Sequence, residues 1–466
     1  MDSMHLRRAL LYSTLAFAGC RFRFDDVSTN GTPDAFQPSD TSPSGHVTVR
    51  VLGEDGETTA GQPIANATVM VVEQDGSVQT YATAANGTVI ATIGGGTTVH
   101  VARPSAELGT WFVYTFAGIG GELEILAGGT PPVTGTTRAM TATLPTFPDA
   151  SFTGATVRGP LRCLVNSDPF AAMPLVTFNF QPGCAGESMR LLAEAEIGSA
   201  IEAHLYTGPT MLADMGALDL SAETWLPIEK YKVVYDGLPA NVTSVGVVGL
   251  VPGSAVGDFI PFDQCSDTPS GGAVDLYPDG PPFVVGSRYA TAMATSDGSM
   301  MAILDPIDEV VGTWHFDPTH IVAAPSAVMI DHVSGNVSWQ LAGTTSADMI
   351  AVQSSFTSST NVVTWTAYAP AGTTSLAYPK IATEPGAIVP PADATWTMPN
   401  VEQIRLSDFN YINALGFIDR DLMRWLDDGS NLPTGTVSLT LSTGAVARIA
   451  PQRRLVDLLA RVVRAR

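Results

Sequence analysis

Apolar and polar residues alternate in short runs along most of the chain. Residues 47–53, Thr68–Val72 and Val78–Thr83 show this pattern, in which successive side chains point to opposite faces of a strand. The turn signals Asp75-Gly76 and Asn86-Gly87 lie between such runs, and Gly and Asn accept the positive φ of tight hairpins. The pattern therefore predicts β-hairpins, and their spacing indicates a β-sandwich.

The same β pattern continues after residue 104, punctuated by Pro and Gly. Met189–Ile197 fits either a strand or a helix, because its alternation suits the former and its composition the latter. Asp419–Leu426 favours a short helix. The further candidate strands are Trp111–Ala117, Met140–Leu144, Leu175–Phe180, Tyr231–Tyr235, Val245–Leu250, Ser326–Ile330, Val337–Gln340, Met349–Gln353, Val362–Tyr368 and Val437–Leu441.

These elements predict an all-β fold, with multi-domain β-sandwiches in series and a short C-terminal amphipathic helix. Pro-rich stretches near 145–160 and 266–287 are candidate boundaries. We expect a first sandwich over residues 46–104 and β-rich domains over 105–285 and 286–450. One β-sandwich plus an irregular β-propeller is the alternative, because many Trp residues follow a Thr, although no WD dipeptide occurs.

Three motifs in the first module carry a resemblance to a known family. They are Gly61-Gln62-Pro63-Ile64-Ala65-Asn66-Ala67-Thr68-Val69, then Asp75-Gly76, then Thr83-Ala84-Ala85-Asn86-Gly87. Their order is similar to that of the carboxypeptidase regulatory-like (transthyretin-like) domain, with Ala84 where the family has Asp. The resemblance covers residues 46–104 and implies a β-sandwich accessory module without catalysis.

The N-terminus resembles the signal peptide of a bacterial lipoprotein. The basic pair Arg7-Arg8 precedes the mostly apolar stretch Ala9–Gly19, which is too short to span a bilayer. This stretch runs into Phe17-Ala18-Gly19-Cys20, which resembles a lipobox with Phe where that motif prefers Leu. The resemblance implies that residues 1–19 are removed and that Cys20 carries a lipid. A plain secretory signal or an internal apolar segment is the alternative.

Residues 20–45 favour a lipidated cysteine followed by a disordered tether. They are rich in Ser, Thr, Pro, Asp and Gly and show neither a strand nor a helix period. The implied location is the bacterial cell envelope, with the protein anchored to a membrane on the periplasmic or extracellular side. The membrane is then a partner through the lipid anchor.

The charge balance limits which other classes of partner are expected. Of 466 residues, 23 are Lys or Arg and 45 are Asp or Glu, a net charge of −22. This acidity argues against nucleic acid and against electrostatic docking to anionic lipid. The tail Pro451–Arg466 differs, because it is basic and gathers its apolar residues on one face of a predicted amphipathic helix. Such a helix could dock on the protein's own acidic surface, on a membrane or on a partner.

Common catalytic signatures are absent from the sequence. It contains no G-x-S-x-G, H-E-x-x-H, G-x-x-x-x-G-K-[ST], C-x-x-C or S-x-x-K motif. We therefore assign no catalytic and no cofactor-binding residue. Asp305, Asp308, His315 and His320 are the candidates for a metal. The two His share no face of a helix or strand, although a turn at Asp317-Pro318 could bring them together. Because zinc needs three or four close ligands and no cysteine is nearby in sequence, no metal site is predicted.

Calcium is a further possible cofactor because carboxylates cluster in two loops. One group holds Asp258, Asp263, Asp267, Asp275 and Asp279, and the other Asp305, Asp308 and Glu309. Calcium prefers such oxygen ligands, yet no spaced D-x-D-x-D-G loop occurs. A solvated acidic surface that keeps the protein soluble is the favoured interpretation.

Three cysteines follow Cys20, and an oxidising compartment favours their pairing. We predict a disulfide between Cys163 and Cys184, which are closest in sequence, and leave Cys265 unpaired. A pairing that involves Cys265 is the alternative.

The favoured function is that of a cell-envelope lipoprotein with a structural or binding role toward a protein or a polysaccharide. Trp111, Tyr114, Trp365 and Tyr368 could stack on sugar rings, although filling the core is their default role.

The alternative function is an extracellular hydrolase that carries the first sandwich as an accessory module. It needs two carboxylates or a catalytic triad after residue 150. Asp305 with Asp308, or His315 with Asp317, are the pairs that the sequence offers.

Overall fold

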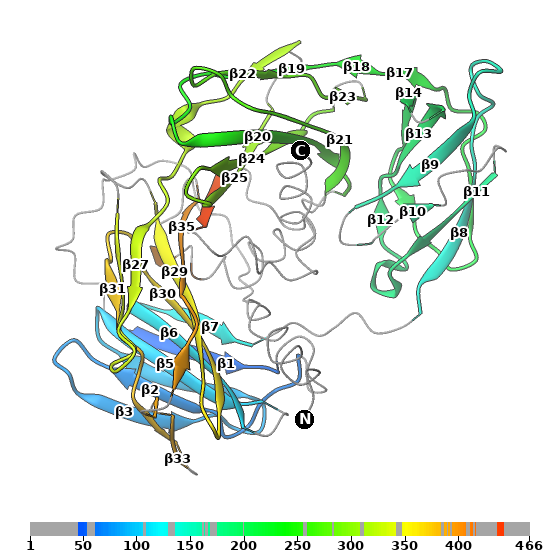
Figure 1. The fold of residues 1–466 in the computed structure, drawn as a ribbon. Coiled ribbons are helices and arrows are strands. Elements are labelled where there is room, and N and C mark those ends of the chain that lie inside the picture. The colour runs from blue at the N-terminus through cyan, green and yellow to red at the C-terminus, as the bar shows by residue number, and fades with distance from the viewer. Residues whose placement is uncertain are drawn as a thin grey trace.

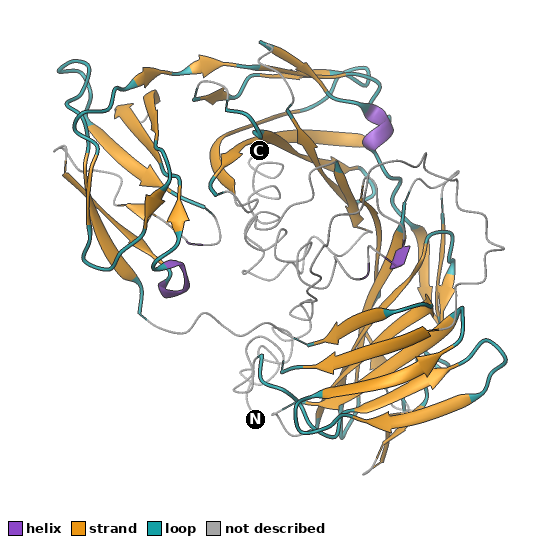
Figure 2. Ribbon diagram, turned by 180° about the vertical axis from the view of Figure 1, so that it is seen from behind, coloured by secondary structure: helices purple, strands orange, loops and turns teal. Residues whose placement is uncertain are grey.

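The computed structural model describes residues 45–53, 61–105, 109–128, 136–160, 163, 166–167, 175–198, 200–254, 259–281, 284–307, 312–341, 347–383, 386–388, 390–391, 394–406, 411–412, 415 and 436–441. Strands form more than half of this part and loops most of the rest, and two one-turn 3-10 helices, η2 (Pro182–Cys184) and η3 (Pro318–His320), occur among them (Figures 1 and 2). The predicted all-β class, with several separate sheets, is confirmed. No helix in the described part has the length and apolar character needed to cross a membrane. Cys20, the tether, Asp419–Leu426 and the basic tail lie outside the described residues.

One large sheet runs through two of the three β bodies visible in Figure 1. It joins the lower body, drawn in blue and yellow, to the green body above it. β34 (Thr395–Trp396) pairs with β29 (Met349–Thr357) and lies beside the main order of strands. In spatial order the strands are β21 (Phe259–Asp267), β20 (Val242–Pro252), β24 (Arg288–Thr295), β25 (Met300–Pro306), β36 (Val437–Leu441), β35 (Asn400–Leu406), β29 (Met349–Thr357), β30 (Val362–Pro370), β6 (Thr110–Ile119), β5 (Thr97–Pro104), β2 (Thr68–Val72) and β3 (Val78–Ala82).

The first sandwich forms where one end of the large sheet packs on a smaller sheet. The smaller sheet has the order β4 (Thr88–Ile93), β1 (Gly45–Val51) and β7 (Leu123–Ala127). Along β1 the alternation seen in the sequence places Val47, Val49 and Val51 in the core with no exposed surface. Burying each of these side chains contributes about 2 kcal/mol. The same core takes alternate residues of β2 and β5 from the facing sheet.

A tight turn between β3 and β4 sets the shape of this sandwich. Gly87 has φ +72°, and a Cβ at this position would lie 2.6 Å from the backbone oxygen of Val51. Only glycine fits such a position without displacing the backbone, which agrees with the Asn86-Gly87 turn that the sequence predicts.

The sheets do not divide at the boundaries predicted from the sequence. β6 and β7 belong to the first sandwich, which therefore extends past residue 104 to at least Ala127. β20 pairs with β24, so the large sheet crosses the expected boundary at residue 285. The correction has a simple cause: alternation shows that a segment is a strand, but it carries no information on which distant strand will pair with it.

The middle of the chain forms a separate module, drawn in cyan and green on the right of Figure 1. One face of its sheet carries a core of its own, which includes Phe178, Phe180 and Trp225. The ambiguous segment 189–197 is mostly strand, because it contains β13 (Leu192–Ile197). The sheet has the order β16 (Ala217–Asp219), β8 (Arg138–Thr143), β11 (Leu175–Phe180), β10 (Asn166–Ser167), β9 (Gly154–Arg158), β13 (Leu192–Ile197), β14 (Ala200–Tyr206) and β17 (Leu226–Pro227).

The other short strands form five smaller sheets in the described part of the chain. They are β12 (Ser188–Met189) with β15 (Thr210–Met211); β18 (Glu229–Lys230) with β23 (Asp279–Gly280); β22 (Val274–Leu276), β19 (Lys232–Tyr235) and β26 (Thr313–His315); β27 (Ser326–Ile330), β28 (Val337–Gln340) and β31 (Ser375–Leu376); and β32 (Ile381–Thr383) with β33 (Gly386–Ile388).

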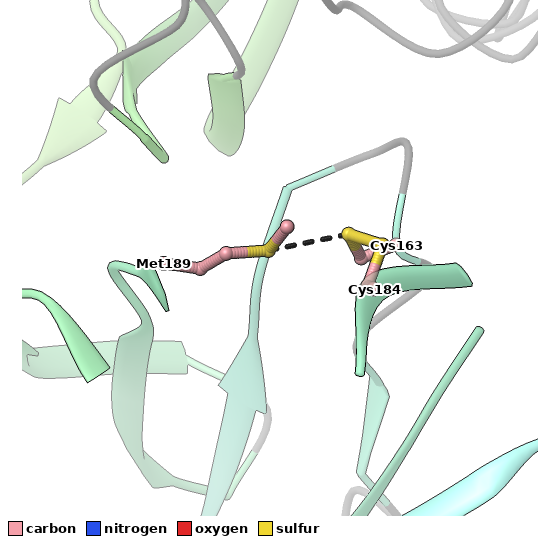
Figure 3. The surroundings of a disulfide bond; sticks show 3 residues. All are labelled: Cys163, Cys184 and Met189. Atoms are coloured by element: carbon pink, nitrogen blue, oxygen red, sulfur yellow. Dashed lines mark hydrogen bonds between the residues drawn. A yellow bond between two sulfur atoms is a disulfide. The ribbon is translucent and has the colours of Figure 1, made fainter. Parts of the chain in front are cut away.

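The predicted disulfide joins Cys163 to Cys184 inside the core of the middle module (Figure 3). Their Cα atoms lie 5.9 Å apart, and both side chains are buried. Met189 Sδ lies 3.2 Å from Cys163 Sγ. Because a disulfide sulfur carries no proton, this is a packing contact between sulfur atoms. Cys265 is free, and burial raises the pKa of its thiol to about 12.

We expect the double substitution Cys163→Ser and Cys184→Ser to destabilise the middle module by about 3 kcal/mol, because the bond closes a loop of about 20 residues in the unfolded chain. Hydrogen exchange of the β11 amides in increasing denaturant measures this loss locally. Cys265→Ser is the control and should leave β11 unchanged. Equal protection of β11 in the double variant and the wild type would contradict the expectation.

Candidate functional site

The structure brings together two of the four residues that the sequence offers as metal candidates. Asp305, in β25, is 2% exposed, and its Oδ1 lies 2.8 Å from Nδ1 of His320 at the end of η3. The two groups form an ion pair when the imidazole of His320 is protonated. The hydroxyl of Thr436 donates a hydrogen bond of 3.0 Å to the same carboxylate oxygen.

The geometry around His320 does not suit a metal ion. Asp305 contacts Nδ1, whereas Oδ2 of Asp317 lies 3.7 Å from Nε2. Because the two ring nitrogens point in different directions, a single ion cannot bind His320 and both carboxylates. His315 is exposed on β26, and Asp308 lies outside the described residues. Within the described ranges, no group of three or more His, Cys, Asp or Glu side chains could hold a metal ion.

His320 instead helps to fasten the segment 317–323 across the large sheet. The contact with Asp305 raises the pKa of His320, and partial burial opposes that shift. The imidazolium form therefore holds η3 against the end of β25. Three side chains of the sheet also donate hydrogen bonds to backbone carbonyls of this segment: Arg405 to Thr319 (2.8 Å), Gln403 to Ala323 (2.7 Å) and Thr440 to Val322 (2.5 Å).

Three of the carboxylates considered for calcium, Asp263, Asp275 and Asp279, are paired with other groups, whereas Asp258 and Glu309 lie outside the described residues. Asp275 lies 2.6 Å from the ammonium of Lys232, and Asp279 lies 3.9 Å from that of Lys230. Asp263 accepts a hydrogen bond of 2.7 Å from the backbone N–H of Asp279. The sequence shows no cation between these acids, but β18 and β19 bring two lysines beside them. The structure therefore assembles salt bridges in this region.

Three of the four aromatic residues considered for sugar stacking lie in the core. Trp365 has no exposed surface, and Tyr114 and Tyr368 are each 5% exposed. Trp111 is half-buried and packs against the same apolar cluster as Trp365. Stacking needs an open ring face, which these core residues do not present.

A second polar cluster, which the sequence analysis did not single out, lies in the middle module. Thr156, Glu194 and His204 stand in register across β9, β13 and β14. Glu194 has no exposed surface and His204 is 2% exposed. Arg158 Nε lies 2.8 Å from Glu194 Oε2, and the Thr156 hydroxyl donates a hydrogen bond of 3.4 Å to the same oxygen.

Burial shifts the pKa values of Glu194 and His204 in opposite directions. It raises the pKa of Glu194 to about 7, against the opposing effect of Arg158. Burial, together with Arg158, lowers the pKa of His204 to about 4. Among the described residues, Oε1 of Glu194 and both ring nitrogens of His204 have no hydrogen-bond partner. The arrangement can therefore hold a proton on the carboxyl group near neutral pH while the imidazole stays neutral.

This cluster lies on the face where the middle module meets the large sheet. In the next row of the same face, Leu192 packs against Val251, Ile260 and Phe262 of β20 and β21. The Tyr206 hydroxyl donates a hydrogen bond to the carbonyl of Pro252. We call the contact made by these residues the module seam. It buries Glu194 and His204 on a side of the sheet that would otherwise face water.

A strand period over 192–197 was the one signal that could have found Glu194. It places Glu194 opposite the core-facing Ala193 and Ala195, as the structure confirms. Alternation alone would still make Glu194 a solvated residue. Its burial depends on the β20–β21 hairpin, which follows much later in the chain.

Comparisons with known proteins add little to this site. No family model matches the chain, so its resemblance to the carboxypeptidase regulatory-like family stays a prediction. No curated protein matches either. A solved structure described as the Bacillus anthracis TIE protein is similar to part of the chain, with 12% identity over 55% of this chain and 46% of that one. Its TM-score is 0.14, so this likeness supports no argument about fold or function.

The ion pair of His320 predicts that replacing this residue lowers the stability of the protein by an amount that depends on pH. Since the folded-state pKa of His320 is raised above 6.5, its stabilising effect is complete below that pH and is lost as the pH rises through the raised value. We expect His320→Gln to cost about 1 kcal/mol at pH 6 and less at pH 9. Chemical denaturation at both pH values measures the difference. The exposed His332→Gln is the control, and an equal loss at both pH values would contradict the expectation.

Glu194 and His204 are expected to change the stability of the folded protein with pH in opposite directions, so that their effects partly cancel in the wild type. The raised pKa of Glu194 lowers stability as the pH rises from about 4.5 to about 7. The lowered pKa of His204 raises stability as the pH rises from about 4 to about 6.5.

Each single substitution removes one of these two effects. The change of stability with pH should then follow the residue that remains. We expect the stability of Glu194→Gln to increase, and that of His204→Gln to decrease, by up to about 3 kcal/mol between pH 4.5 and 6.5. Hydrogen exchange of the β13 amides at several pH values reports this. Parallel pH profiles for both variants would refute the opposed shifts.

Proposed function

We propose that this chain is a cell-envelope lipoprotein, anchored by a lipid on Cys20, with a structural or binding role on the periplasmic or extracellular side. One observation carries the proposal: a basic start, a short apolar stretch and a cysteine follow one another in the order of a lipoprotein signal. No other feature of the sequence specifies an address as directly.

The Cys163–Cys184 disulfide supports an extracytoplasmic location. Disulfides persist in secreted and periplasmic proteins, whereas cytosolic thiols are kept reduced. This one is buried in the core of the middle module, so the module folds around the bond. A chain that forms it needs an oxidising compartment, which agrees with the signal-like start.

A non-catalytic role agrees with the way the polar groups are used. Asp305 and His320 tie η3 to the sheet, and Glu194 and His204 lie within the module seam. The first sandwich fits an accessory module of the carboxypeptidase regulatory-like kind, and β1 begins at Gly45, soon after the proposed anchor. In this proposal the body presents its exposed strands to an envelope protein or a polysaccharide.

A test of the anchor uses the full chain made in a bacterial host. Mass spectrometry should find a mature N-terminus at Cys20 carrying lipid, and the protein should be in the membrane fraction. Cys20→Ala should release it, because a single apolar segment of this length does not span a bilayer. Cys265→Ala is the control and should stay with the membrane. A mature N-terminus elsewhere, or retention of Cys20→Ala in the membrane, would overturn the proposal.

A further inference from the structure

β3 is an open edge of the large sheet. Within the described residues its only strand partner is β2, and no hydrogen bond joins the backbone of Val78–Ala82 to any other strand. Alternate N–H and C=O groups of an edge strand point away from the sheet and need a partner. At the other end of the sheet, β21 is flanked by β22 and β23. The two ends of the sheet are thus different.

β3 also lacks the features that usually protect an edge. Natural edge strands carry charged residues, proline or a bulge that prevents pairing with another chain. The sequence of β3 is Val-Gln-Thr-Tyr-Ala, and its pairing with β2 has no register shift. In a chain with a net charge of −22, this is a regular and uncharged edge.

The neighbouring edge extends the uncharged surface. β4, Thr-Val-Ile-Ala-Thr-Ile, is the edge of the smaller sheet and contacts β3 on the same side of the sandwich. Val78 of β3 is 55% exposed and Ile90 of β4 is 63% exposed. Within the described part of the chain, both strands thus have an edge without a strand partner, and both carry an exposed apolar side chain. β3 marks this side of the first sandwich at the lower left of Figure 1.

We propose that a second copy of this chain pairs with β3, so that two large sheets join edge to edge about a twofold axis. Two copies with a net charge of −22 repel each other over most of their surface. An edge without charges is where they can approach at the least electrostatic cost. The twofold arrangement also satisfies the free edges of both copies at once and leaves no new open edge at this position.

The residues of β3 are self-complementary in the antiparallel direction. Centred on Thr80, this register pairs Thr80 with its own copy and Gln79 with Tyr81, whose hydroxyl already donates a hydrogen bond to Gln79 within one chain. Thr–Thr pairs and aromatic residues stabilise antiparallel neighbours. The antiparallel direction also separates Asp75, at the turn before β3, from its own copy, whereas a parallel pair would bring the two carboxylates together.

The first test places a charge on the twofold axis. The full chain, purified in a mild detergent, should form dimers in sedimentation experiments up to about 100 µM. Thr80→Lys sets two like charges opposite each other and should weaken dimerisation at least about tenfold. Thr177→Lys is the matched control, because Thr177 is an exposed strand residue inside the sheet of the middle module. It should dimerise like the wild type.

A second test uses geometry and does not depend on the effect of a charge. Directly opposed residues in an antiparallel pair have Cβ atoms about 5 Å apart. Thr80→Cys should therefore cross-link to its copy under mild oxidation faster than Thr177→Cys. A wild type that stays monomeric, a Thr80→Lys variant that dimerises normally, or equal cross-linking of the two cysteine variants would each overturn the proposal. None of these results depends on whether Cys20 carries a lipid.

Discussion

The parallel pairing of β6 with β30 is the constraint on which the rest of the architecture depends. It places residues 110–116 beside residues 362–368, although some 250 residues separate them in sequence. Everything in the large sheet beyond β30 is linked to the first sandwich through this one strand pair. The first sandwich, whose strands β1 to β7 lie within residues 45–127, is therefore joined to the rest of the large sheet only when the C-terminal half of the chain returns to it.

A small polar network fixes that pairing from inside the core. Trp365 Nε1 donates a hydrogen bond of 3.0 Å to the Thr115 hydroxyl, which lies 2.9 Å from Nδ1 of His100. Since burial lowers the pKa of His100 to about 4, the imidazole is neutral and its Nδ1 can accept the Thr115 proton. Side chains thereby join three neighbouring strands, β5, β6 and β30. Such a hydrogen-bonded network specifies the strand pairing more narrowly than apolar packing alone.

The two polar clusters described above, around Glu194 and around Asp305, follow one physical rule. A buried charge is tolerated where a partner compensates for lost hydration, as Arg158 does for Glu194 and His320 does for Asp305. Each cluster lies where two parts of the chain meet: η3 on the large sheet, and the middle module on the β20–β21 hairpin. Their position favours a role in fixing these contacts, with the ionisation of one residue in each cluster sensitive to pH near neutrality.

The sequence by itself determined the local structure. Alternation and turn residues predict β2, β11, β27 and β28 with the bounds that the structure has, because side-chain direction repeats along the strand itself. The Cys163–Cys184 pairing also followed from closeness in the chain and is present. The order of strands in the sheets and the true extent of the first sandwich did not follow, since both depend on pairings between distant segments. The two polar clusters share this cause: His320 meets Asp305 through a turn, and Glu194 is buried by a hairpin that lies far along the chain. Only the tertiary structure decides which polar residues lose water, because burial is a property of the face that another segment covers.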